Sequence, residues 1–344
     1  MSSLGHHSSF FKLLPIILSI FFFTGCPQLI EPEPENPALA LQKAQGREVS
    51  GKINIDTAIH AFNNWNRRCE TRLGNLIADA MKEIGGAQIG IMNGGGIRPL
   101  VSSQPNNLPL NTVPKGELTR EQVNTIFPFQ NKLTVIRLRG YRLKQMLEHS
   151  AAAVTNTVFA TQDQDHDADG AVHGDCRTNG SGSGFTASGG FLQVSSGFKV
   201  HYKTANAMRV TNGATGLSTQ INTQGSRVVK MVLNGITIYE NPSGDFSTGW
   251  AQGPSSCTYK TTNFTNSAAC SFFSLAVSDF YVDQGGDNYS MIAPASAEVA
   301  SDGSVVVERR TNLVTADVLW DYLLQRVEIL LPIKPVIEGR IIYE

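Results

Sequence analysis

The sequence predicts an α+β fold, that is, a mixed-sheet α/β arrangement in which helices pack on a mixed sheet. Three observations predict it. Several segments carry apolar residues at helical spacing, and others have the short apolar or alternating pattern of strands. The two kinds of segment do not alternate strictly along the chain, so a purely parallel sheet built from βαβ units is not expected.

Composition supports a globular protein of neutral character. Of the 344 residues, 41% are hydrophobic and 17% are charged, which is enough apolar material to repay the entropy of folding. There are 28 Lys and Arg against 29 Asp and Glu, a formal net charge of -1. This balance creates no positive field to gather phosphate backbones, so we expect no nucleic-acid partner.

Residues 1–25 have the pattern of a lipoprotein-type signal peptide. The apolar run over 10–23 is too short for a bilayer core, which needs about 20 apolar residues, but it suits a signal peptide. Gly25 directly precedes Cys26, as in a bacterial lipobox, where the cysteine is lipidated and becomes the mature N-terminus. We therefore expect export to the bacterial cell envelope and a membrane anchor on Cys26. Cleavage by an ordinary signal peptidase is the alternative.

Residues 26–45 predict an extended tether, because prolines fix φ and neighbouring glutamates repel one another. Residues 46–344 are then expected to fold. Beyond Cys26 the chain has an even number of cysteines, which in an exported protein predicts disulfides. Cys257 and Cys270 flank one polar loop and are the natural pair. Cys69 with Cys176 follows only by elimination, since four cysteines allow three connectivities.

Three helices are predicted in the first half of the folded region. Apolar spacing predicts a helix over 72–84 that stops at Gly85-Gly86, followed by a buried strand over 87–92. Thr119 and Gln122 have capping-box spacing and start a helix that ends before Pro128. A strand over 133–138 and a helix over 141–154 come next.

The second half is predicted to be richer in strands. They lie at 191–194, 198–202, 228–233 and 271–277, and the turn Asn234-Gly235 predicts a hairpin. Residues 314–327 form a closing helix. Between these elements, 155–190 and 241–269 lose all periodicity and are interpreted as loop insertions.

Two glycine-rich turns present groups that suit a ligand. Asn93-Gly94-Gly95-Gly96-Ile97-Arg98 follows a strand, and it combines flexible backbone with an amide and a planar guanidinium. Asp287 after Gly285-Gly286 offers a carboxylate that can accept two hydroxyl hydrogens, as a ribose would provide. The alternative in each case is a tight turn with solvated side chains.

Aromatic residues follow the same turns. Phe129 comes after Pro128, and Phe280 and Tyr281 precede Asp287. Two rings on loops can clamp a flat heterocycle, and each aromatic–base stack contributes about 1–3 kcal/mol. Burial in the core is the alternative for each ring.

Six motifs together, in order and approximate spacing, resemble the C-terminal domain of 5′-nucleotidases. They are Thr71-Arg72-Leu73-Gly74-Asn75-Leu76-Ile77-Ala78-Asp79-Ala80-Met81, Asn93-Gly94-Gly95-Gly96-Ile97-Arg98, Phe127-Pro128-Phe129, the stretch from Gly140 to Glu148-His149-Ser150, Phe191-Leu192-Gln193-Val194 and Gly285-Gly286-Asp287. The closing Val336-Ile337-Glu338-Gly339-Arg340-Ile341 also resembles the end of that family. The resemblance covers about residues 50–344.

The resemblance implies a nucleotide-specificity domain, with roles carried over residue by residue. The purine would be contacted by Asn93 and by the backbone amide of Gly95, and Asp287 would bind the ribose hydroxyls. The remaining roles fall to Arg67 and Arg98, which would hold the ribose or α-phosphate region, and to Phe129 and Phe280, which would sandwich the base. Arg68 and Arg72 are rivals of Arg67, and Tyr281 is a rival of Phe280, because the stretch before Gly285 is one residue longer than usual.

In this family hydrolysis belongs to a metallophosphatase domain, whose two-metal centre needs a dense set of Asp, His and Asn ligands. The sequence has no Asp-x-His and no Asn-His pair, so we expect no catalytic residues in this chain. A separately encoded metallophosphatase is the expected partner. We expect a structural role for His149, which lies late in a helix.

One metal site is predicted outside those motifs. Asp165, Asp167 and Asp169, followed by Gly170, have the first half of a calcium loop, although Cys176 stands where a bidentate Glu is expected. A solvated acidic loop is the alternative. His166 and His173 leave open a transition metal instead of calcium.

The sequence thus favours a lipid-anchored domain that binds a nucleoside or nucleotide, purine in preference, and needs another chain or domain for hydrolysis. The alternative is a cell-surface interaction lipoprotein that reuses the scaffold through its enlarged loops. Hydrolysis by this chain alone is a third hypothesis.

Overall fold

A computed structural model describes residues 53–55, 66–98, 116–152, 188–203, 206–211, 220–223, 225–241, 270–294, 298–328, 333 and 338–343. These residues belong to one compact unit, Gly51–Glu344. The signal peptide and the tether predicted over 1–45 lie outside the described residues. Within the part described, no helix has both the length and the apolar character needed to cross a membrane.

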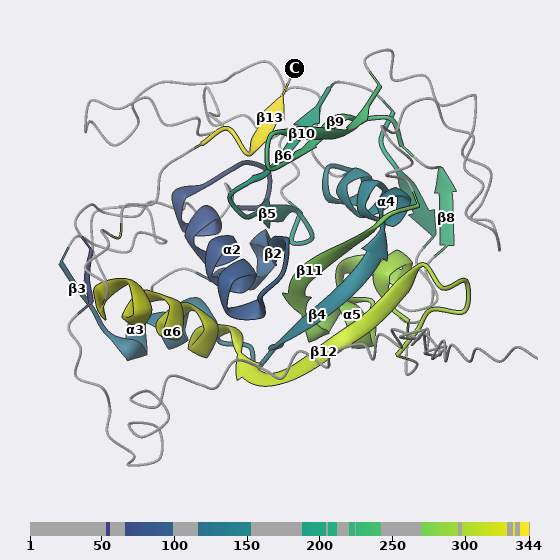
Figure 1. Ribbon diagram of the computed structural model, residues 1–344. Coiled ribbons are helices and arrows are strands. Elements are labelled where there is room, and N and C mark those ends of the chain that lie inside the picture. Colours follow the sequence, from purple (N-terminus) through teal and green to yellow (C-terminus); the bar gives the residue numbers. More distant parts are fainter. Residues whose placement is uncertain are drawn as a thin grey trace, which may run out of the picture. The chain divides into compact units, whose positions relative to one another are not determined.

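A five-stranded mixed sheet forms the centre of the unit, in the order β12-β4-β11-β2-β5 (Figure 1). Its strands are β2 (Ile89–Asn93), β4 (Lys132–Arg139), β5 (Leu192–Val194), β11 (Phe272–Ser278) and β12 (Val305–Val314). Only the β11–β2 pair is parallel, and the other three pairs are antiparallel. The α+β prediction with a mixed sheet is therefore confirmed.

Helix α2 (Arg72–Gly85) covers one face of this sheet and confirms the helix predicted over 72–84. Thr71 caps its start by accepting a hydrogen bond from the Gly74 N–H at 2.9 Å. Gly86 ends it in the left-handed region, at φ 62°, which glycine adopts without strain. The helix ends against β4 and β11, where Gly85 lies beside Val135 and Ala276.

Helix α4 (Gly140–Ser150) packs on the opposite face of the sheet. Neighbouring residues of a strand point to opposite faces, so Ile136 and Leu275 point away from α2, toward which Val135 and Ala276 point. The predicted inward residues of α4, Leu143, Met146 and Leu147, are fully buried in one core cluster with Ile136 and Leu275. The helix ends at Ser150 instead of the predicted 154. On the same side, α5 (Asp279–Gln284) leads into the two short turns η5 (Gly286–Asn288) and η6 (Ser290–Ile292).

A second, four-stranded sheet lies beside α4, in the order β10-β9-β6-β13 (Figure 1). Its strands are β6 (Phe198–Tyr202), β9 (Val228–Leu233), β10 (Ile236–Glu240) and β13 (Ile341–Tyr343). The predicted hairpin is confirmed, since Asn234 and Gly235 both have positive φ, 50° and 80°, as a type I′ turn requires. The buried carboxylate of Glu148 on α4 accepts hydrogen bonds from the backbone N–H groups of Arg227 and Val228, which joins helix and sheet.

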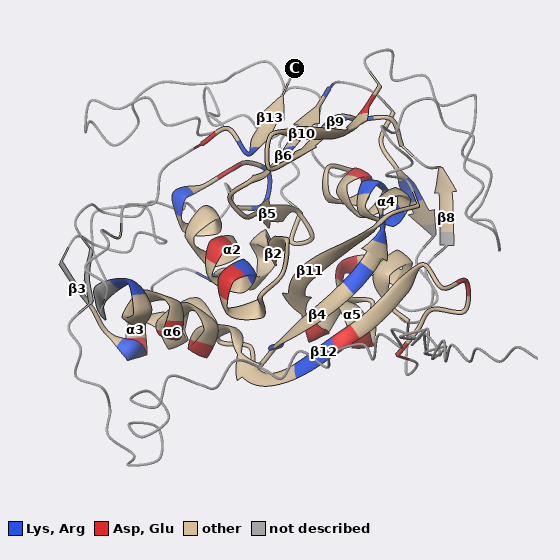
Figure 2. Ribbon diagram, viewed as in Figure 1, with Lys and Arg blue, Asp and Glu red and all other residues tan. Residues whose placement is uncertain are grey.

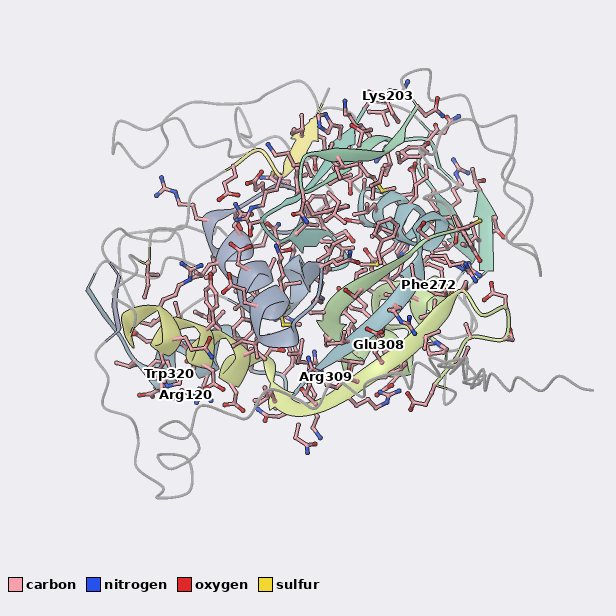
Figure 3. The ribbon with its side chains drawn as sticks, viewed as in Figure 1. Arg120, Lys203, Phe272, Glu308, Arg309 and Trp320 are labelled. Carbon is pink, nitrogen blue, oxygen red and sulfur yellow. The ribbon has the colours of Figure 1, made fainter. Side chains whose placement is uncertain are left out.

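Helices α3 (Arg120–Ile126) and α6 (Thr315–Glu328) lie together at one end of the unit. The predicted capping box is present in full, with Thr119 and Gln122 bonded reciprocally. Arg120 pairs with Asp317 and lies over the ring of Trp320, 5.7 Å from its centroid (Figure 3).

Several elements were not predicted, above all the ten-residue edge strand β12. Its middle is polar, and Figure 2 shows charges of both signs on it beside the basic residues of β4. Glu308, labelled in Figure 3, pairs with Arg137 of β4 at 2.5 Å. An edge strand needs apolar residues on one face only. The charged run Glu308-Arg309-Arg310 interrupts the apolar pattern, so the sequence did not indicate a strand here. The other missed elements are α5, β13 and the short pairs β1 (Ile53–Ile55) with β3 (Gly116–Leu118) and β7 (Arg209–Thr211) with β8 (Gln220–Thr223).

The end of the described chain is fixed to the start of α2 by buried polar groups. The guanidinium of Arg340, 3% exposed, donates to both carboxylate oxygens of Asp79 at 2.9 Å. It also donates to the carbonyl oxygens of Asn75 and Val194, at 3.2 and 3.1 Å. One side chain thus connects β13, α2 and β5.

Removing this side chain is expected to destabilise the fold strongly. Arg340→Ala leaves the Asp79 carboxylate without its buried partner, and we expect the free energy of unfolding to fall by about 3–5 kcal/mol. Urea denaturation followed by circular dichroism measures this change. The matched control is Arg310→Ala, which breaks exposed ion pairs with Asp283 and Glu298 and should cost about 1 kcal/mol or less. Equal losses in the two variants would contradict the prediction.

Candidate functional site

The glycine turn after β2 folds into η1 (Gly94–Gly96) and is fixed through its own backbone. The N–H of Gly94 donates to the carbonyl oxygen of Phe191 at 2.7 Å, and that of Gly95 donates to Gly189 at 2.8 Å. A Cβ atom at Gly94 would lie 2.0 Å from the carbonyl oxygen of Asn66, so only glycine fits there. Since the Gly95 amide already has an acceptor, it belongs to the frame of the site and is not offered to a purine.

Asn93, the last residue of β2, is directed at Asp287. Its side chain is buried, and its amide nitrogen donates to Oδ2 of Asp287 at 3.0 Å. This bond joins two residues that lie far apart in the sequence, as the predicted site requires. The sequence interpretation assigned the Asn93 side chain to the base, whereas here its amide N–H donates to Asp287. The geometry therefore supports a role for Asn93 in holding Asp287.

Asp287 lies in a left-handed turn and is half-buried. Its φ is 51°, and Gly285 and Asn288 are also left-handed, at 58° and 66°. Burial raises the pKa of the Asp287 carboxyl above its ordinary value. The bond from Asn93 and the positive charges of Arg67 and Arg98 act in the opposite direction on this pKa without cancelling the effect of burial.

Two arginines face this carboxylate. Burial lowers the pKa of Arg67, the nearby positive charge of Arg98 lowers it further, and Asp287 opposes both. Arg98 also lies over the ring of Phe129, 5.1 Å from its centroid. The rivals Arg68 and Arg72 are buried, whereas the charge of the half-buried Arg67 interacts with that of Asp287.

The predicted aromatic residues differ in exposure. Phe129 is 42% exposed, which is unusual for a large apolar side chain. Phe280 is half-buried and its ring lies against Gly286, where a Cβ atom would approach it to 2.2 Å. Tyr281 is fully buried and packs edge-on against Tyr289, with ring centroids 4.9 Å apart. Phe280 is therefore the ring beside the Asp287 turn, and Tyr281 is a core residue.

Two parts of the site were missed or misassigned from the sequence. Residues 188–190 were expected to end a loop insertion, but they form part of the site. The carbonyl oxygen of Gly189 accepts from the Gly95 N–H, and that of Gly190 accepts from the Tyr289 hydroxyl at 2.5 Å. Nε2 of His149 lies 2.8 Å from the backbone oxygen of Asp287. The paired glycines before β5 were the available signal for residues 188–190, and no local pattern pointed from His149 to Asp287.

The comparison with known families gives the context of this geometry. A family model described as the 5′-nucleotidase, C-terminal domain, matches residues 49–242, more than half of the chain. The chain belongs to this family. All seven residues assigned to ligand contacts lie in the described part of the structure, and Asn93, Arg67, Arg98 and Asp287 interact with one another.

Individual relatives match over limited lengths. The chain is 38% identical over 105 residues to the trifunctional nucleotide phosphoesterase protein YfkN of Bacillus subtilis (strain 168), which is 29% of this chain and 6% of that protein. It is 30% identical over 145 residues to a snake venom 5′-nucleotidase of Naja atra, 37% of this chain and 26% of the venom protein. The chain thus spans less than a third of the length of these relatives.

Two solved structures are similar over most of this chain and less than half of their own. The 5′-nucleotidase precursor from Thermus thermophilus has a TM-score of 0.49 and 23% identity, covering 89% of this chain and 42% of that one. The NAD nucleotidase NadN of Haemophilus influenzae has a TM-score of 0.45 and 14% identity, covering 89% of this chain and 40% of that one.

Metal and cysteine predictions fall mostly elsewhere in the chain. Among the residues that the structure describes, no group of three or more His, Cys, Asp or Glu side chains is arranged to hold a metal. Asp165, Asp167 and Asp169 lie outside those residues, as do Cys26, Cys176 and Cys257. The calcium loop, the lipid anchor and both disulfide pairings therefore stay predictions.

Replacing the half-buried carboxylate of Asp287 is expected to stabilise the fold. Because the pKa of Asp287 is higher in the folded chain than in the unfolded chain, ionisation at neutral pH favours unfolding. Asp287→Asn stays neutral, tolerates positive φ and can still accept from Asn93, so we expect the Tm at pH 7 to rise by about 2 °C. The gain should disappear as the pH falls below about 3.9, where aspartates are protonated even in the unfolded chain.

Calorimetric melting between pH 3 and pH 7 tests whether Asp287→Asn raises the Tm at neutral pH and loses this gain at low pH. Asp283→Asn is the control, since this exposed carboxylate pairs with Arg310 at the surface and its loss should not raise the Tm. A Tm of Asp287→Asn at or below that of the unmodified protein at pH 7 would contradict the argument.

Proposed function

We propose that the site binds a nucleoside or nucleotide through its ribose, its base and its 5′-phosphate. The observation that carries the proposal is that one oxygen of the Asp287 carboxylate has a hydrogen-bond donor and the other has none among the described residues. Oδ2 is bound to Asn93, whereas no donor among the described residues is paired with Oδ1. A carboxylate oxygen of a half-buried side chain that keeps a free acceptor position suits a ligand hydroxyl, and vicinal ribose hydroxyls supply two.

The base is proposed to stack on Phe129 and Phe280. An aromatic ring 42% exposed beside a cation offers a flat apolar surface that water covers poorly. Stacking is tolerant of base identity, and a larger base covers more of the ring, which favours a purine. The Asn93 amide is bound to Asp287, so we do not assign base recognition to it.

The phosphate is proposed to lie near Arg67 and Arg98. The two guanidinium groups are close enough for each charge to affect the other, and both are partly buried. An anion between them relieves this repulsion and accepts bidentate hydrogen bonds from planar forks. These arginines thus favour a nucleotide over the corresponding nucleoside.

Hydrolysis of the 5′-phosphate is proposed to require a metallophosphatase domain or a separate metallophosphatase chain. The relatives named above are nucleotidases and a nucleotide phosphoesterase several times longer than the matched region. We further propose export to the cell envelope, a lipid anchor on Cys26, and disulfides pairing Cys257 with Cys270 and Cys69 with Cys176. Calcium binding by Asp165, Asp167 and Asp169 is a separate proposal that titration calorimetry with Ca²⁺ would test.

Loss of the exposed ring should weaken binding of every nucleoside. For Phe129→Ala we expect the affinity for adenosine to fall by about fivefold to a hundredfold, which corresponds to one lost base–aromatic stack. Isothermal titration calorimetry with adenosine measures it. Ile236→Ala is the matched control, because this side chain is 65% exposed on β10 and belongs to no part of the site. Absence of adenosine binding by the unmodified protein, or unchanged binding by Phe129→Ala, would refute the proposal.

Loss of one guanidinium should affect the phosphate selectively. Arg67→Met keeps the length of the side chain and removes its charge, so we expect the affinity for AMP to fall by about tenfold or more. The affinity for adenosine should change little, because adenosine lacks the phosphate. Arg137→Met, which removes a surface arginine of β4, is the control. A parallel loss for both ligands would show that Arg67 does not contact the phosphate.

A further inference from the structure

His149 occupies an unusual position at the end of α4. Its Nε2 atom lies 2.8 Å from the backbone carbonyl oxygen of Asp287, which belongs to a different element 138 residues later. A carbonyl oxygen only accepts hydrogen bonds, so Nε2 must carry the hydrogen. Burial lowers the pKa of His149, which keeps the ring neutral near pH 7 and makes Nδ1 an unprotonated acceptor.

The other ring nitrogen has nothing to accept from. Nδ1 is buried and has no hydrogen-bond partner among the described residues. A buried acceptor without a donor costs stability, and a phenylalanine or leucine would fill the same space without that cost. Packing alone therefore gives no reason for a histidine here, whereas the Nε2 bond does.

The turn that receives this bond needs support. Asp287 and Asn288 both have positive φ, at 51° and 66°, and side chains rarely adopt that region unless neighbouring contacts hold them there. Within the turn, the Tyr289 N–H donates to Gly286 at 3.1 Å. The Tyr289 ring packs edge-on against His149, with centroids 4.7 Å apart. His149 is thus the contact from α4 that meets both the backbone and the ring of this turn.

Asp287 is consequently held at two points. Asn93 binds its side chain through Oδ2, and His149 binds its main chain through the carbonyl oxygen. With both ends fixed, the direction of Oδ1 is fixed as well. Without the second bond, the left-handed turn is free to relax toward commoner backbone angles, and the carboxylate would move with it.

We propose that His149 is a positioning residue that sets the direction of the Asp287 carboxylate for the ribose hydroxyls by donating from Nε2 to the Asp287 main chain. The ribose part of this inference rests on the function proposed above. The effect on the turn does not, because it concerns the protein without ligand.

Two variants separate the hydrogen bond from the ring. His149→Phe keeps an aromatic ring against Tyr289 and removes the donor. His149→Gln places an amide nitrogen near the position of Nε2 and restores the donor without the ring. Each is measured by amide hydrogen exchange without ligand and by the ratio of affinities for adenosine and 2′,3′-dideoxyadenosine.

In His149→Phe we expect exchange at the Tyr289 and Ile292 amides to accelerate about fivefold to tenfold, the equivalent of one lost hydrogen bond. Exchange in β4 and β11 should stay unchanged. The preference for adenosine over the dideoxy ligand should fall by a similar factor, and His149→Gln should restore both readouts. Unchanged exchange at the turn in His149→Phe, or equal changes in the two variants, would overturn the proposal.

The experiments distinguish a failure of the proposed nucleoside binding from a failure of the proposed role of His149. If the unmodified protein binds neither ligand, nucleoside binding is refuted, and the exchange measured without ligand still decides the role of His149. If His149→Phe fails to fold, the ring ¹⁵N chemical shifts of the unmodified protein decide. A hydrogen on Nε2 near pH 7 supports the proposal, and a hydrogen on Nδ1 overturns it.

Discussion

The buried carboxylate of Glu70 is the constraint on which the rest of the structure depends. Its two oxygens accept four hydrogen bonds, from the Asn75 side chain and from the backbone N–H groups of Glu338, Arg340 and Ile341. Backbone donors of this kind would be costly to leave unpaired in the interior. One side chain just before α2 therefore fixes the path of the last described strand. The segment 66–71 that carries it also carries Arg67, so the anchor and the site share a backbone.

The site is assembled in the same manner, by buried polar bonds between distant segments. The Gln193 side chain donates to the carbonyl oxygens of Asn66 and Cys69 and accepts from the Thr71 N–H, which holds segment 66–71 against β5. Directional bonds of this kind position groups more closely than apolar contacts, which tolerate sliding. The main chain of Arg67 is therefore held in place, and its charge interacts with that of Asp287.

The sequence predicted the features that local physics determines, and missed those that depend on contacts between segments. Helices α2 and α3 were predicted because their caps and apolar spacing lie within a few residues. Strand β12 was missed because an edge strand needs no continuous apolar pattern. Spacing alone could not choose between Phe280 and Tyr281, since one step along a helix rotates a side chain by about 100°. In α5 that rotation separates a half-buried ring from a fully buried one. The hydrogen bond from Asn93 to Asp287 likewise depends on the tertiary structure, because the two residues are 194 positions apart in the sequence.

The electrostatics of the site are unfavourable without a ligand, and that has a functional meaning. Burial raises the pKa of Asp287, and burial together with Arg98 lowers the pKa of Arg67, so both groups are held in environments that disfavour their charged forms. A fold selected for stability alone would place neutral groups there. Hydroxyls donating to the carboxylate and an anion between the arginines would relieve both penalties together. The cost built into the free site is therefore a physical argument for the ligand that we propose, a sugar diol joined to a phosphate.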